Sequence, residues 1–299
     1  MATPAPTAST APSPLATAEQ CVQAAAGHRD ATSENFPVAS FLLPRRIRGH
    51  VLAFYRFARA ADDIADAVAL SPAEKIAGLD RLLAVIDGAA PHTSAETAAA
   101  GHRASLRETG VSDRHARDLL AAFRRDAENP RCADWADLMA YCRLSAASVG
   151  RFLIELNGDD DTAYPASDAL CAALQVLNHL QDLKEDLLEL DRIYLPLDWL
   201  AAEGATVADL RADSLNPAMR RVIDRCLDET DRLLTNAATL PCRLSRSRLR
   251  YEAAVILTNA ERLSHRLRRD DPLAGRVALG NLARMGCVVR GIFRAWRCP

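Results

Sequence analysis

Aromatic residues make up only 5% of the 299-residue chain, and lysine occurs only at Lys75 and Lys184. Strand-length runs of β-branched or aromatic residues are scarce, whereas Ala and Leu, which favour helices, dominate the sequence. The chain also lacks any run of about 18 apolar residues, which a membrane-spanning helix needs. These shortages predict an all-α fold without a helix that spans a membrane.

The chain also lacks a strong excess of either charge, because its formal net charge is only −2. This balance argues against a protein that binds nucleic acid. It hides a basic C-terminal segment, in which thirteen arginines from Arg243 to Arg297 are set against only four acidic residues. An anionic membrane surface, a diphosphate or a partner protein would complement this charge, although solvated helix faces explain it more simply.

No CxxC pair and no other metal-binding spacing occurs among the eight cysteines. Reduced, partly buried thiols in a cytoplasmic protein are therefore expected. Residues 1–16 are mostly Pro, Ala, Thr and Ser and lack the apolar segment of a signal peptide, so we expect a disordered tail. No linker or internal repeat follows, and residues 17–299 are predicted to form a single helical domain.

Apolar periodicity, together with helix start and stop signals, predicts a series of helices after the tail. The first begins near Thr17, and a long second one ends before Ser71-Pro72. From the second helix onward, the expected ranges are about 45–69, 73–87, 95–109, 112–126, 134–156, 167–189, 207–212, 216–238, 245–269 and 273–295.

Four polar residues lie on one face of the helix expected at 45–69. They are spaced i, i+4, i+7 and i+11, and they are Tyr55, Arg59, Asp62 and Asp66. Carboxylates one helical turn apart repel each other, and a cation would relieve that repulsion. Oxygen ligands at this spacing suit Mg²⁺, which keeps several waters and also contacts phosphates. A solvated acidic face is the alternative interpretation.

A second polar stripe, on the helix expected at 167–189, has nearly the same geometry. Its members are spaced i, i+3, i+7 and i+11, and they are Gln175, Asn178, Asp182 and Asp186. Apolar neighbours surround this stripe, and polar groups beside a core are costly unless they are hydrogen-bonded or bound to metal. A surface stripe is again the alternative. In a bundle, the two stripes could face each other across a cavity, where Mg²⁺ ions would bridge a diphosphate and an apolar pocket would protect a carbocation.

Two further residues are candidates for the same site. Arg192, just after the second stripe, would bind diphosphate oxygens or compensate the dipole at the end of its helix. Tyr141 precedes Ala146, Ala147 and Gly150, which are small enough for a close helix approach. Its phenol would relay a proton or stabilise positive charge, or it would simply pack in a tight helix crossing.

Together these elements resemble the squalene/phytoene synthase family of head-to-head prenyl synthases. The resemblance rests on YRFARAADDIAD at 55–66, YCRLSAASVG at 141–150, NHLQDLKED at 178–186 and RIYLP at 192–196. Their order and spacing agree with the family pattern over about residues 30–290. The resemblance implies a single-domain isoprenoid-synthase helical bundle with a central cavity.

The resemblance also implies roles for the residues at matching positions. The implied ligands of several Mg²⁺ ions are Asp62, Asp66, Asp182 and Asp186. The implied contacts to the substrate are Phe36, Tyr55, Arg59, Asn178, Arg192 and Tyr194. The implied catalytic residues are Tyr141 and Arg59.

Within the family, ENFPVASFLLP at 34–44 and ELDRIYLPLDWL at 189–200 are similar to the hopanoid-pathway branch of hydroxysqualene synthases. That branch ionises presqualene diphosphate, rearranges the cation and quenches it with water, without a nicotinamide. The resemblance therefore implies a prenyl diphosphate substrate, and the cysteine usage adds the expectation of a cytoplasmic enzyme. Contact with the inner membrane surface or with other squalene-pathway enzymes, and the oligomeric state, stay open.

Three alternatives are also open on the sequence. Head-to-head condensation, of the presqualene diphosphate, squalene or phytoene synthase type, would use the same metal site. A non-catalytic assembly protein on the same fold would be expected to have lost its aspartates, and all four are present. A carboxylate-bridged di-iron bundle needs Glu-x-x-His pairs, and the sequence has none.

Overall fold

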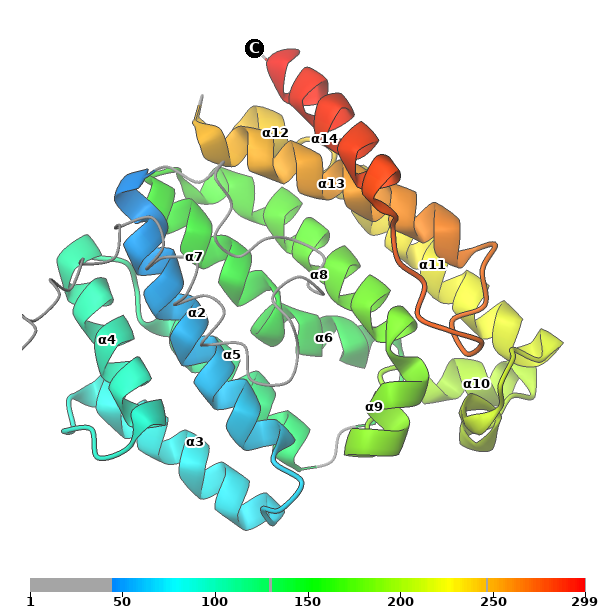
Figure 1. The fold of residues 1–299 in the computed structure, drawn as a ribbon, viewed down its shortest axis with the longest axis horizontal. Helices are drawn as coiled ribbons and strands as arrows, with labels where there is room; N and C mark the ends of the chain where they lie inside the picture. The colour runs from blue at the N-terminus through cyan, green and yellow to red at the C-terminus, as the bar shows by residue number, and fades with distance from the viewer. Residues whose placement is uncertain (1–44, 129–130, 246, 299) are drawn as a thin grey trace, which may run out of the picture. The chain divides into compact units, whose positions relative to one another are not determined.

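The structure is a computed structural model that describes residues 45–128, 131–245 and 247–298, all within one compact unit that spans residues 39–299. Across the described residues the chain forms helices, with one isolated bridge between Arg131 and Ile193 and no strand, so the prediction of an all-α fold is confirmed (Figure 1). The predicted tail, the helix expected near Thr17 and Phe36 lie outside the described residues.

The helices follow one another in the order that Figure 1 labels. They are α2 (Arg45–Asp66), α3 (Pro72–Asp87), α4 (Ser94–Thr109), α5 (Arg114–Ala127), α6 (Trp135–Ser145), α7 (Ala147–Asn157), η1 (Asp161–Ala163), α8 (Tyr164–Gln181), α9 (Leu183–Leu190), α10 (Leu197–Glu203), η2 (Val207–Arg211), α11 (Pro217–Ala237), α12 (Leu240–Arg243), α13 (Arg248–Leu267) and α14 (Asn281–Trp296).

The helices pack in two groups that α5, α6 and α7 connect. In the first group, α2, α3 and α4 pack against one another, and α2 and α3 also pack against α5. In the second group, α8 packs against α7, α11 and α13, and α14 lies along α13 (Figure 1). Fully buried side chains from both groups form one core, for example Phe57, Phe152, Leu177 and Ile223. No described helix is long and apolar enough to cross a membrane.

Local signals explain why several boundaries match their predictions. Ser71 caps α3, because its hydroxyl accepts a hydrogen bond from the Glu74 amide and the Glu74 carboxylate accepts one from the Ser71 amide at 2.8 Å. Pro72 then occupies the first helical position, where its missing amide costs nothing. Gly110 ends α4 in the left-handed conformation, which glycine adopts without strain.

The single helix predicted at 134–156 is wrong, because the chain breaks at Ala146 into α6 and α7. Two serine side chains flank the break and bond to helix carbonyls. The Ser145 hydroxyl donates to the Tyr141 carbonyl at 3.1 Å, and the Ser148 hydroxyl donates to the Ser145 carbonyl at 3.2 Å. Such side-chain bonds compete with the backbone ladder and disturb a helix.

The predicted close approach of small residues after Tyr141 does occur, between α7 and α8. A Cβ atom at Gly150 would lie 2.5 Å from the Ser167 hydroxyl and 2.6 Å from the Cys171 sulfur. The absence of a side chain at Gly150 therefore sets how closely α7 packs on α8.

The helix predicted at 167–189 also divides, at Asp182, into α8 and α9. Two more predicted ranges change. The segment at 207–212 is the short 3₁₀ helix η2, and the helix predicted at 273–295 begins only at Asn281. The seven-residue helix α10 follows Pro196, where the sequence pattern indicates only a chain break. Short helices of this kind depend on tertiary packing, because their own propensity is too weak to reveal them.

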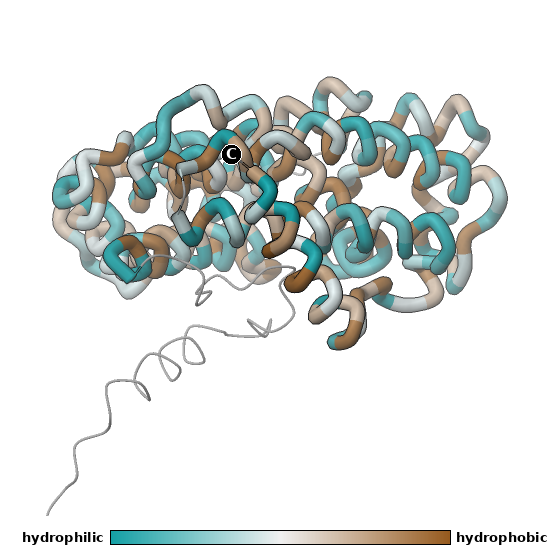
Figure 2. The backbone as a smooth tube through the Cα atoms, turned by 90° about the horizontal axis from the view of Figure 1, so that it is seen from above, coloured by the Kyte–Doolittle hydropathy of each residue, from teal (hydrophilic) through white to brown (hydrophobic). Residues whose placement is uncertain are grey.

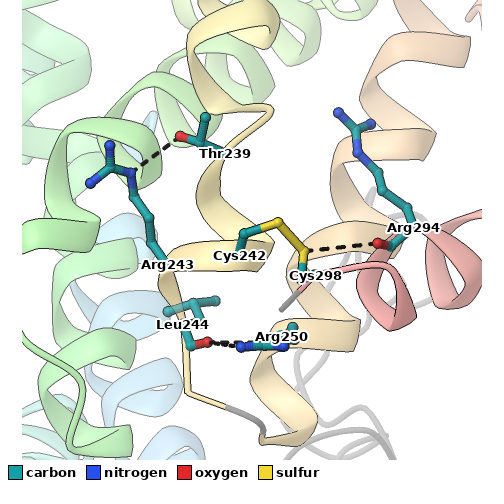
Figure 3. Close-up of a disulfide and its surroundings, with 7 residues drawn as sticks. All are labelled: Thr239, Cys242, Arg243, Leu244, Arg250, Arg294 and Cys298. Carbon is teal, nitrogen blue, oxygen red and sulfur yellow. Dashed lines mark hydrogen bonds between the residues drawn. A yellow bond between two sulfur atoms is a disulfide. The ribbon is translucent and has the colours of Figure 1, made fainter.

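A disulfide joins Cys242 of α12 to Cys298, which follows α14 (Figure 3). The expectation of reduced thiols is therefore wrong for this pair. The Cα atoms lie 4.9 Å apart, although the residues are 56 positions apart in the sequence, so only the fold reveals the pairing. The five other described cysteines are free thiols. Because this pair is oxidised, the cysteines no longer support the expectation of a cytoplasmic protein.

A buried histidine, His102 of α4, lies among aromatic rings from α2 and α7. Its ring centroid is 5.0 Å from that of Phe54, 5.2 Å from that of Phe57 and 5.6 Å from that of Phe152. Within the described residues neither ring nitrogen has a hydrogen-bond partner. Burial, assisted by the nearby His115, lowers the pKa of His102 from 6.5 to about 4.

This histidine predicts a loss of stability in mild acid. Between about pH 6.5 and 4, unfolded His102 binds a proton that the folded protein excludes, so the free energy of unfolding falls as the pH falls. We expect the wild type to lose roughly 2 kcal/mol more than a His102→Leu variant between about pH 7 and pH 5. Urea unfolding of both proteins at each pH measures this difference, and two parallel pH profiles would contradict it.

Candidate active site

The first predicted stripe lies on the C-terminal half of α2. Arg59 bonds the Asp62 carboxylate at 2.9 Å and the Asp63 carboxylate at 2.8 Å, so its guanidinium lies between neighbouring acids of the same helix. The opposite face of α2 anchors it in the core through Phe57, Ala61 and other apolar side chains. The stripe is thus held at the boundary between core and solvent.

Asp62 is the residue of this stripe whose pKa is clearly shifted. Burial, and then repulsion by Asp66, raise the pKa of Asp62 from 3.8 to about 7, although Arg59 opposes the rise. A cation beside Asp62 and Asp66 would favour both charged forms and remove this penalty. The oxygen donors and their electrostatics therefore fit a hard divalent cation such as Mg²⁺.

Arg192 connects the second motif segment to the first. Its guanidinium bonds the Asp66 carboxylate at 2.6 Å and the Ala65 carbonyl at 3.0 Å, and its side chain is only 7% exposed. Asp191 adopts a left-handed conformation at the end of α9, and the Arg192 amide bonds the Asp186 carbonyl at 3.0 Å. This turn directs Arg192 to α2. The Arg192 guanidinium therefore lies against α2 and not at the end of its own helix, where it would compensate the helix dipole.

The second predicted stripe spans the break between α8 and α9. The Asp182 carboxylate forms an ion pair with Arg276 at 2.6 Å, and the Asp186 carboxylate lies 3.8 Å from the His179 ring. Both aspartates are largely buried, with side chains 13% exposed. Gln175, at the start of the stripe, contacts the His179 ring at 3.2 Å. The break at Asp182 thus places the two carboxylates against different partners.

A buried carboxylate, Asp126 of α5, holds the two tyrosines that the sequence singles out. The Tyr141 hydroxyl donates to Asp126 at 2.8 Å, and the Tyr194 hydroxyl donates to its other oxygen at 2.9 Å. Burial raises the pKa of Asp126 above its usual range, although Arg192 opposes this. Burial, and then Asp126, raise the pKa of both phenols well above 10, so both are neutral hydrogen-bond donors.

The tyrosines also connect this cluster to the second stripe. The Tyr194 ring stacks on the His179 ring, with centroids 3.6 Å apart, and it lies 5.2 Å from the Tyr141 ring. The Arg125 guanidinium lies 5.5 Å from the centre of the Tyr141 ring. Contacts therefore run from α2 through Arg192 and the two tyrosines to α8 and α9.

Most of the predicted site residues lie in this connected set. Tyr55 on α2 and Asn178 on α8 are half-buried on their predicted stripes, and their contacts to substrate stay predictions. Across the described residues, no group of three or more His, Cys, Asp or Glu side chains is arranged to hold a metal ion. In this structure arginines lie against Asp62, Asp66 and Asp182 instead.

The sequence interpretation missed several residues of this set, among them Asp126, His179 and Arg276. Asp126 interrupts the apolar face of its helix, where Leu119 and Phe123 precede it at helical spacing, and that interruption is a usable signal. Arg276 lies in the irregular segment between α13 and α14, and only the fold brings it to Asp182.

The helical fold and the two paired-aspartate stripes are those of an isoprenoid-synthase bundle, and the comparison with known families agrees. The chain belongs to the squalene/phytoene synthase family, whose family model matches residues 29–283. This match includes both aspartate stripes, Tyr141 and the segment with Arg192.

Comparison with individual relatives shows which enzymes of the family the chain is similar to. The chain is 43% identical to a hydroxysqualene synthase of Sinorhizobium fredii over 255 residues, which cover 85% of each protein. A solved squalene synthase, HpnC from Alicyclobacillus acidocaldarius, superposes with a TM-score of 0.71 at 30% identity and covers 85% of this chain and 92% of that one. A phytoene synthase of Rhodobacter capsulatus is 34% identical over a shorter stretch, 69% of this chain and 61% of that protein.

Proposed function

We propose that this protein is a hydroxysqualene synthase, which converts presqualene diphosphate and water to hydroxysqualene and diphosphate. The observation that carries the proposal is the 43% identity to the hydroxysqualene synthase of Sinorhizobium fredii over 85% of both chains. The weaker and shorter similarity to a phytoene synthase points in the same direction. Water, and not hydride, ends the reaction, so no nicotinamide is required.

The four aspartates of the two stripes would hold Mg²⁺ ions at the substrate diphosphate. When bound, the ions neutralise the negative charge that develops as the diphosphate leaves. The raised pKa of Asp62 supports this assignment, because a cation would offset the burial and repulsion that cause it. Arg59 and Arg192 would bind diphosphate oxygens, since each already places a guanidinium beside these carboxylates.

Tyr141 and Tyr194 would line the part of the site where the carbocation forms. Their neutral rings offer the negative faces that attract a cation, and a buried environment strengthens that attraction. Asp126 fixes the direction of both hydroxyl groups, so it acts as a positioning residue. We assign the catalytic role to Tyr141, whose phenol would relay a proton or stabilise positive charge, while its O–H is held by Asp126.

Two other functions compete with this proposal. Condensation of two farnesyl diphosphates would use the same aspartates, and relatives named phytoene synthase share part of the chain. A non-catalytic assembly role on this fold would not need the aspartates. We also propose that the domain begins at residue 17, that the bundle encloses a central cavity and that the protein is cytoplasmic.

A product assay tests the proposal. The purified protein is incubated with Mg²⁺ and either presqualene diphosphate or farnesyl diphosphate, without NADPH and in ¹⁸O-labelled water, and the lipids are identified by mass spectrometry. We expect labelled hydroxysqualene from presqualene diphosphate only, and no product when EDTA removes the metal. Presqualene diphosphate made from farnesyl diphosphate would instead favour condensation, and the absence of any product would favour the assembly role.

A further inference from the structure

The helix α14 carries most of the large apolar side chains that the described residues expose to solvent. Ten large hydrophobic side chains are exposed in the described part of the chain, and seven of them belong to α14. They recur at intervals of one to four residues along the outward side of the helix, so they form one continuous apolar stripe. The members of this apolar stripe are Leu282, Met285, Val288, Val289, Ile292, Phe293 and Trp296.

Small side chains of α14 pack against α13. The described residues therefore leave the apolar stripe on the other side of α14 uncovered. The buried residues of α14 are Cys287, Gly291 and Ala295. A Cβ atom at Gly291 would lie 2.6 Å from the Val255 Cα atom, so the two backbones are in close contact there. A surface helix normally buries its large apolar residues. Here the small residues are buried and the large ones are exposed. Figure 2 shows hydrophobic (brown) and hydrophilic (teal) positions alternating along the helix beside the label C.

The charges beside the stripe are of one sign. Residues 281–298 contain four arginines and no acidic residue: Arg284, Arg290, Arg294 and Arg297. Arg294 reaches back to Glu261 of α13 at 2.7 Å, and Arg297 lies 4.5 Å from the centre of the Phe293 ring. An exposed apolar stripe flanked by arginines complements an anionic surface with an apolar interior.

We propose that α14 binds flat in the interface of an anionic lipid membrane, with its apolar stripe inserted among the lipid chains. A second copy of this chain is a poorer occupant, because a symmetric contact through α14 would bring eight arginines together. The helix is also short, about 24 Å for 16 residues, so one of its faces is small for a stable protein–protein interface. The proposal is independent of the reaction that the enzyme catalyses.

Vesicle sedimentation with the full-length protein tests the proposal. We expect binding to phosphatidylcholine vesicles that contain phosphatidylglycerol and much weaker binding to phosphatidylcholine alone. An Arg284→Gln/Arg290→Gln variant should bind the anionic vesicles about thirty-fold more weakly, at roughly five-fold for each arginine. An Ile292→Gln/Trp296→Gln variant should lose at least about ten-fold. The matched control is Val68→Gln, which removes an apolar side chain that is 80% exposed outside α14 and should bind like the wild type.

Each outcome of this experiment supports or contradicts binding of α14 to a membrane. Equal sedimentation of the wild type and the Ile292→Gln/Trp296→Gln variant, or no sedimentation of the wild type, would overturn the proposal. A photoreactive amino acid in place of Val289 identifies what covers the stripe. Cross-links to lipid support the proposal, whereas cross-links to a second copy or to residues 1–44 of the same chain contradict it. Because these measurements need no turnover, they are separate from the product assay.

Discussion

Replacing Asp62 or Asp182 with Asn is expected to lower kcat by roughly 10²–10³-fold, because each substitution removes a carboxylate from the group that would hold the diphosphate metal ions. Asn keeps the size of the side chain, so the packing around α2 and around the α8–α9 break should be unchanged. Release of diphosphate from presqualene diphosphate at saturating Mg²⁺ measures the effect.

The same substitution at Asp62 separates function from folding. Because the pKa of Asp62 is raised from 3.8 to about 7, the metal-free protein loses stability as the pH rises through this range, and the full penalty is present above about pH 7. Asp62→Asn should therefore raise the free energy of unfolding at about pH 8 while it lowers turnover. A variant that loses both activity and stability would show that the carboxylate has a structural role instead.

Two acids between the stripe residues provide matched controls. Asp63 and Glu185 have the same chemistry and lie next to Asp62 and Asp186, but their side chains are 58% and 41% exposed. Asp63→Asn and Glu185→Gln should keep turnover within about three-fold of the wild type, as surface substitutions usually do. Comparable losses at all four positions would contradict the assignment of the stripes as metal ligands.

Replacing Tyr141 and Tyr194 separately with Phe is the second large expected effect. Each change removes one hydrogen bond to Asp126, at 2.8 Å and 2.9 Å, so both variants should lose a similar stability of about 1 kcal/mol. If Tyr141 is the catalytic tyrosine, Tyr141→Phe should also lower kcat by at least about 10²-fold, whereas Tyr194→Phe should lower it by less than about ten-fold.

If Tyr141→Phe and Tyr194→Phe lose the same stability but differ in turnover, Tyr141 has a catalytic role that Tyr194 lacks. Thermal or urea unfolding gives the stability, and initial rates with presqualene diphosphate give kcat and KM. Equal turnover in the two variants would assign both phenols to positioning alone. An Asp126→Ala variant would remove both hydrogen bonds at once and should cost about 2–4 kcal/mol, since two buried hydroxyl groups would lose their acceptor.

The sequence predicts the parts of this protein that depend on local patterns. The helical class follows from composition and apolar periodicity, and helix starts such as Ser71-Pro72 follow from capping. The aspartate stripe on α2 also follows from spacing, because a helix repeats every 3.6 residues and places such positions on one face. Arg192 follows from its place directly after the second stripe.

The features that the sequence does not predict all depend on contacts between distant segments. Arg276 reaches Asp182 across 94 positions, and the Cys242–Cys298 disulfide spans 56. The division of α8 from α9 occurs where Asp182, a poor residue for a helix interior, finds its ion partner in the fold. Periodicity reports which side of a helix is apolar, but it carries no information about which distant element that side meets.

The ion pair between Arg192 and Asp66 has a consequence for the order in which the protein assembles. The two residues are 126 positions apart, so the pair cannot form until the intervening helices have closed a long loop. Contacts of such high sequence separation slow folding and are completed late. A partly folded chain would therefore contain both aspartate motifs as separate helices without joining them into one site. The protein would acquire the ability to bind and ionise a diphosphate only at the end of folding, when its core is already closed to water.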